Sequence, residues 1–163
     1  MCALALIAVI VALGSIPELR SRWFLNEAVE RYEAGTEASV AAARASLDRA
    51  LAFKPNLVPA LLLQGRIALE RAEREAGDVS AARDVYDRLE QALKEGGLST
   101  AAADNGIGCA LLIEAIRPKQ KDRNKRLAEA YSRFANAIQL DPSDGDIRVN
   151  AALCHLHLQD ANY

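Results

Sequence analysis

The strongest constraint on the fold of this chain is one spacing of small, large and proline residues that ends two distant segments. The segments are "SLDRALAFKP" at 46–55 and "RFANAIQLDP" at 133–142. The matching positions, four, three and five residues apart in both, are Ala43, Leu47, Ala50 and Pro55, and Ala130, Phe134, Ala137 and Pro142. Four- and three-residue steps place side chains on one face of a helix, and proline ends the helix. We therefore expect two helices that pack in the same way.

The rest of the chain also reads as helical. Apolar residues recur at three- and four-residue spacings, and the abundant Ala, Leu, Glu, Arg and Lys are good helix formers. Helices are expected near 18–34, 38–53, 57–76, 79–95, 100–116, 124–140 and 145–159. We predict an all-α fold. The net charge of −2 gives no indication of nucleic-acid binding.

A weaker third copy lies between the two segments, where Ala82 and Tyr86 repeat the first step. Small residues also sit in the preceding helices. Gly65 follows Pro55 by ten residues, Ala152 follows Pro142 by ten, and Gly108 lies in a similar apolar context. A glycine or alanine there allows the two helices of a pair to cross closely.

On these residues, the chain resembles the tetratricopeptide repeat (TPR) family, a helix–turn–helix unit of about 34 residues with an Ala-x3-Phe…Pro pattern. The resemblance covers about residues 22–160, although Ala82 and Ala130 follow their counterparts by more than one period. It implies an α-solenoid of about three helix pairs plus a final helix. The alternative is an ordinary helical bundle in which the alanine spacing arose by chance.

The resemblance also implies a function. TPR solenoids mostly bind peptides or protein surfaces along a concave face lined by the first helix of each pair. The residues expected on that face are Leu62, Arg66, Leu69, Asn105, Cys109, Leu112, Val149 and Leu153. The chain is therefore expected to be a non-catalytic scaffold or adaptor. The alternative is a structural or assembly subunit of a membrane complex.

Residues 1–17 form a separate apolar segment ahead of the helical domain at 18–163. The first sixteen residues carry no charge, and as a helix they would be roughly 24 Å long, short of the ~30 Å core of a bilayer. We expect a membrane anchor, so that Arg20 and Arg22 place the domain in the cytoplasm. The alternatives are a cleaved signal peptide, with a secreted or periplasmic domain, and a buried helix.

The segment 117–126 is strongly basic. Its cationic residues are Arg117, Lys119, Lys121, Arg123, Lys125 and Arg126. If the chain is anchored in the cytoplasm, this loop is a possible site for anionic lipid headgroups. It lacks the interleaved aromatics of a nucleic-acid site, and the alternative is a solvated loop between helices.

No residue set indicates catalysis, a metal site or a cofactor. His155 and His157 are two residues apart, so on a helix they face different directions. Three cysteines without a CxxC spacing do not make a disulfide framework. Phosphate-binding glycine motifs are also absent from the sequence. We therefore expect that the protein is not an enzyme.

Overall fold

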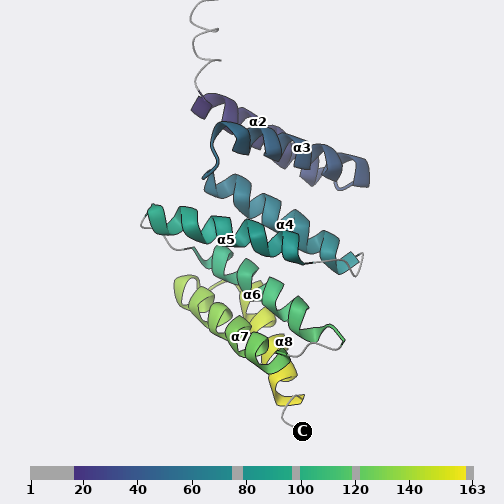
Figure 1. Ribbon diagram of the computed structural model, residues 1–163, viewed down its shortest axis with the longest axis vertical. Coiled ribbons are helices and arrows are strands. Elements are labelled where there is room, and N and C mark those ends of the chain that lie inside the picture. Colours follow the sequence, from purple (N-terminus) through teal and green to yellow (C-terminus); the bar gives the residue numbers. More distant parts are fainter. Residues whose placement is uncertain (1–16, 75–78, 97–99, 119–121, 161–163) are drawn as a thin grey trace, which may run out of the picture. The chain divides into compact units, whose positions relative to one another are not determined.

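The computed structural model describes residues 17–74, 79–96, 100–118 and 122–160. These residues are helical and contain no strand, which confirms the predicted all-α class (Figure 1). The helices are α2 (Pro17–Glu33), α3 (Glu37–Phe53), α4 (Val58–Arg74), α5 (Ser80–Glu95), α6 (Ala101–Ile116), α7 (Arg123–Leu140) and α8 (Gly145–Asp160). The predicted helix ends lie within about two residues of these bounds. The apolar segment 1–17 lies outside the described residues except for Pro17, which begins α2.

Local chemistry accounts for several helix ends. Gly35 adopts a positive φ of 69° in the turn after α2, a conformation that glycine takes without strain. Thr36 then caps α3, because its hydroxyl accepts a hydrogen bond from the Ser39 amide and the Ser39 hydroxyl accepts one from the Thr36 amide. Thr100 caps α6 through the amide of Ala103.

The turn before α8 is organised by two aspartates around the exposed Pro142. Asp141 Oδ1 accepts hydrogen bonds from the amide and hydroxyl of Ser143. Asp144 Oδ1 accepts from the amides of Asp146 and Ile147, so it satisfies donors at the start of α8 that no helical carbonyl reaches. Proline therefore ends α7, and the aspartates begin the next helix.

Contacts divide the chain into two compact units, Met1–Gln64 and Gly65–Tyr163, with the boundary inside α4. In the first unit, α2 packs against α3. Ala28 of α2 and Leu47 of α3 are fully buried, and so is Ser46. The Ser46 hydroxyl donates to Glu27 Oε2 at 2.9 Å, so this buried polar group is satisfied.

In the second unit, α6 packs against α5, α7 and α8, and α7 also packs against α8. Leu111, Leu127 and Phe134 are fully buried at the centre of this cluster. Two largely buried acidic residues of α6 form ion pairs with arginines of the neighbouring helices. Glu114 pairs with Arg83 of α5 and with Arg126 of α7, and Asp104 pairs with Arg133 of α7 at 3.1 Å.

Glycines allow two of these helix crossings. A Cβ atom added to Gly108 would lie 2.6 Å from a ring carbon of Phe134, and one added to Gly65 would lie 2.7 Å from Tyr86. Carbon atoms in contact are normally 3.5–4.0 Å apart. Each aromatic ring of the second helix therefore occupies the space that a Cβ of the first helix would fill.

The structure adds a third glycine of this kind, Gly106. A Cβ there would lie 2.3 Å from a ring carbon of Tyr86, at the contact between α5 and α6. Gly106 is not part of the repeated spacing, because it faces a side chain of the preceding helix α5 and not of its own partner α7. Its spacing of two residues from Gly108 was the only available signal.

The residues of the repeated spacing take the following positions. The buried residues are Ala43, Leu47, Ala50, Gly65, Ala82, Tyr86, Gly108, Ala130, Phe134 and Ala137, and the exposed ones in turns are Pro55 and Pro142. Ala152, in contrast, is exposed on α8 and makes no close helix crossing in the described part of the chain. Its neighbour Ala151 is buried, because it shares a helix face with the buried Ile147 and Cys154.

Candidate partner-binding groove

The second unit contains an apolar groove of about 590 Å³ along α6. It is lined by Glu73, Cys109, Leu112, Ile113, Ile116, Arg117, Pro118, Asn150 and Leu153. These residues come from α4, from α6 with the two residues after it, and from α8. We refer to this set as the α6 groove.

Helical spacing explains why α6 supplies most of the lining. Cys109, Leu112, Ile113 and Ile116 occupy positions i, i+3, i+4 and i+7, so they lie on one face of the helix. Ala110 and Leu111, which do not line the groove, are fully buried. One face of α6 thus builds the core, and the adjacent face remains open as the wall of the groove.

The polar floor of the groove is internally bonded. Asn150 Nδ2 of α8 donates to Asn105 Oδ1 at 3.0 Å and approaches Cys109 Sγ at 3.5 Å. Burial, together with the negative charge of Glu73, raises the pKa of Cys109 to about 12. Since the thiolate is the nucleophilic form of cysteine, Cys109 remains a neutral, unreactive thiol near neutral pH.

The rim of the groove carries one carboxylate and one guanidinium group, those of Glu73 and Arg117. Nη2 of Arg117 is buried and makes no hydrogen bond to any described residue. A buried donor without a partner is unfavourable.

The residues expected on a concave face are only partly brought together. Leu112 and Leu153 line the groove, and Asn105 lies beneath it through its bond to Asn150. Cys109 is the further expected residue that lines it.

Four expected residues do not belong to the groove lining. Leu69 is buried, with 8% of its surface exposed, and is not among the residues that line the groove. Val149 is exposed and does not line the groove, although it lies one helical turn before Leu153 on the same face of α8. Arg66 donates to Glu70 on its own helix at 3.2 Å, and Leu62 is half-buried in the first unit. These residues were placed on one surface from the TPR resemblance, which does not specify the rotation of each helix.

The basic segment 117–126 is not one continuous loop. Arg123, Lys125 and Arg126 belong to the first turns of α7, and Arg126 is paired with Glu114. Arg117 lines the α6 groove, while Lys119 and Lys121 lie outside the described residues. Lys125 and Arg126 lie inside the helix expected at 124–140, and Arg123 joins them because α7 begins one residue earlier than expected. These three residues are therefore helical and are not part of a loop.

The described ranges contain no group of three His, Cys, Asp or Glu side chains arranged to hold a metal ion. The ring of His155 lies 5.8 Å from that of Tyr131, between centroids. None of the helices from α2 to α8 has the length and apolar character needed to cross a bilayer.

No known protein family, curated protein or solved structure matches this chain significantly.

Proposed function

We propose that the chain is a non-catalytic scaffold of the TPR type, an α-solenoid that binds a peptide or protein segment in the α6 groove. This proposal is supported mainly by the set of helices that supply the residues lining the groove. Its residues come from α4, α6 and α8, which are alternate helices and the first members of successive pairs. In TPR solenoids the first helices line the binding face.

The groove favours a particular class of ligand. Leu112, Ile113, Ile116 and Leu153 offer apolar surface, which side chains such as leucine or phenylalanine would cover. The guanidinium group of Arg117 adds a positive charge beside that surface, which favours a carbonyl or carboxylate oxygen. The proposed ligand is thus an apolar peptide segment that carries an oxygen acceptor next to its buried side chains.

We further propose that residues 1–17 attach the protein to a membrane with the helical domain in the cytoplasm. Support comes from the sixteen uncharged residues at 1–16 and from Arg20 and Arg22 directly after them. A membrane-attached scaffold would recruit its partner to that surface. A permanent subunit of a membrane complex would instead keep the groove filled.

Two substitutions on α8 test the groove. Leu153 lines it and Leu156 does not, although their exposed fractions are similar at 44% and 57%. Tagged full-length chain is purified with its partners, and the partners are identified by mass spectrometry. Leu153→Glu should remove the specific partner and Leu156→Glu should retain it. Loss with both variants, or with neither, would contradict binding in the α6 groove.

Extraction separates the scaffold from the permanent subunit. After solubilisation, the membrane fraction is washed with increasing salt and detergent, and the stoichiometry of the partner is followed. A scaffold should release its partner progressively. A partner that stays at constant stoichiometry through the harshest wash would favour the subunit.

A further inference from the structure

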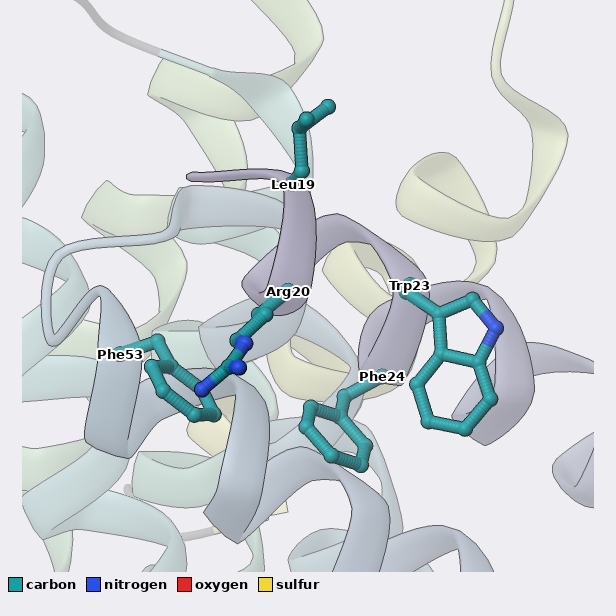
Figure 2. Close-up of a pocket in the computed structure, with 5 residues that line it drawn as sticks. All are labelled: Leu19, Arg20, Trp23, Phe24 and Phe53. Carbon is teal, nitrogen blue, oxygen red and sulfur yellow. The ribbon is translucent and has the colours of Figure 1, made fainter. Parts of the chain in front are cut away.

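A second surface, on the first unit, is apolar and aromatic but is not part of the α6 groove. It surrounds a hollow of about 370 Å³ lined by Leu19, Arg20, Trp23, Phe24 and Phe53. The first four residues lie near the start of α2, and Phe53 is the last residue of α3. We refer to these five residues as the aromatic patch (Figure 2).

The rings of the patch form a connected row. The Trp23 and Phe24 rings meet edge to face at 4.8 Å between centroids, and the Phe24 and Phe53 rings are stacked at 5.9 Å. Figure 2 shows Arg20 extending toward the Phe53 ring, where its guanidinium carbon lies 5.5 Å from the ring centroid. Arg49 lies over Phe24 in the same manner at 5.7 Å.

This row is unusually exposed for residues of its type. Trp23 leaves 60% of its surface in solvent, Leu19 leaves 44% and Phe53 leaves 36%. Exposed apolar surface of this kind marks a contact with a partner or with a membrane. The chemistry of the surrounding residues distinguishes the two.

Charge around the patch is predominantly positive. The cations in the patch or next to its residues are Arg20, Arg22, Arg49 and Lys54. The carboxylate of Glu18 is close to two of them, at 2.8 Å from Lys54 and 3.7 Å from Arg22. The hydrogen bond from Lys54 and the two positive charges lower the pKa of Glu18, so it stays ionised and paired.

Tryptophan and arginine beside one another match the interfacial zone of a bilayer. Tryptophan prefers the headgroup level, and arginine keeps its stem in apolar surroundings while its charged end reaches the phosphates. The patch also begins three residues after the uncharged segment 1–16. Its sequence position is therefore next to the segment that we propose for membrane attachment.

We propose that the aromatic patch lies in the headgroup region of an anionic bilayer, with the Trp23 ring at the level of the upper acyl chains. The inference rests on the membrane attachment proposed above and adds a lipid contact made by the folded unit itself. Arg20 and Arg49 would bind lipid phosphates, and the three rings would cover the apolar boundary. The orientation of α2 at the membrane would then be set by Trp23 and Phe53.

Trp23 is the single tryptophan of the chain, so its fluorescence reports on the patch directly. Full-length protein is mixed with phosphatidylcholine vesicles that contain phosphatidylserine, and pelleting and emission are both measured. Emission should shift to the blue in the vesicles. Lipids brominated close to the glycerol should quench it more strongly than lipids brominated near the end of the acyl chain.

Matched variants locate the contact. In a Trp23→Phe chain that also carries Tyr131→Trp, the new tryptophan reports from an exposed site on α7 and should not be quenched. Arg20→Ala should weaken binding to the anionic vesicles about fivefold, the effect of about one unit charge near an anionic surface. Arg148→Ala, which removes an exposed cation on α8, should leave binding unchanged.

The possible failures can be told apart. Protein that pellets with vesicles while Trp23 emission stays unchanged would overturn the patch and leave membrane attachment intact. Blue-shifted emission before lipid is added would mean that protein covers the patch, either a second copy or residues of the same chain, and would also overturn the proposal. Stronger quenching near the acyl-chain ends would place Trp23 inside the bilayer core, contrary to an interfacial patch.

Discussion

The helix pairs α2–α3 and α6–α7 each bury a small residue on the first helix and a large residue on the second, but with different side chains. In α6–α7 the large residue is Phe134, and the small one has to be Gly108 because a Cβ would overlap the ring. In α2–α3 the buried residues are Leu47 and Ala28. We infer that the combined size of the small and the large residue is similar in the two helix pairs. The choice of glycine or alanine then follows from the size of the facing side chain.

Removing the aromatic ring should have the largest effect. Phe134→Ala leaves a cavity at a fully buried position and should lower the free energy of unfolding by about 3–5 kcal/mol. Denaturant titration of the purified protein measures it. Tyr131→Ala on the same helix is the control, because Tyr131 is 42% exposed and its loss should matter much less. Equal effects at both positions would contradict a central role for Phe134.

Enlarging a small residue of the pattern should have the next largest effect. Ala137→Leu places extra carbons at a fully buried position of α7 and should cost about 1–3 kcal/mol. Ala152→Leu makes the same change at an exposed position of α8 and should stay within about 0.5 kcal/mol of the original protein. Thermal melting of both variants gives the difference. A neutral Ala137→Leu variant would undermine the register of the repeated spacing.

The most specific test is a substitution whose effect on the free energy of unfolding should change sign with the residue at position 134. Gly108→Ala should destabilise the protein by about 1–3 kcal/mol, because the new Cβ would lie 2.6 Å from the Phe134 ring. In a Phe134→Leu background the ring is gone, and the same change should be neutral or stabilising by up to about 1 kcal/mol through helix propensity. A double-mutant cycle measures the coupling. Purely additive effects would show that the ring does not determine the need for glycine.

The reciprocal change in the first unit should be the smallest. Ala28→Gly removes a Cβ from a fully buried position of α2 and should cost about 1–2 kcal/mol, from lost packing and from the lower helix propensity of glycine. Combining it with Leu47→Phe should recover part of that loss, since the larger ring would occupy the vacated space. If Leu47→Phe destabilises both backgrounds equally, the two helix pairs do not follow the same size rule.

The sequence was sufficient for the helices but not for the groove. Periodicity, proline stops and caps are local, so the helix ends could be predicted to within about two residues. The groove depends on the rotation of three helices about their own axes. Leu69 therefore proved to be buried, and Ile113 and Ile116 line the groove although they were not selected.

Contacts between residues far apart in the chain could not be predicted from the sequence either. Glu114 is paired with Arg83 and Arg126, which are 31 and 12 residues away, and no local pattern identifies such partners. The same holds for the aromatic patch, since Phe53 of α3 joins residues near the start of α2. Trp23 and Phe24 were visible as adjacent aromatics, but their continuation through Phe53 required the structure.

The position of Tyr86 also limits which substitutions the chain can accept in evolution. Its ring fills the space beside two glycines, Gly65 on α4 and Gly106 on α6. A smaller residue at 86 would therefore release two positions at once, 41 residues apart by their numbering. We expect the three positions to vary together in evolution. Alanine should be tolerated at 65 and 106 only in sequences in which the tyrosine has been replaced by a smaller residue.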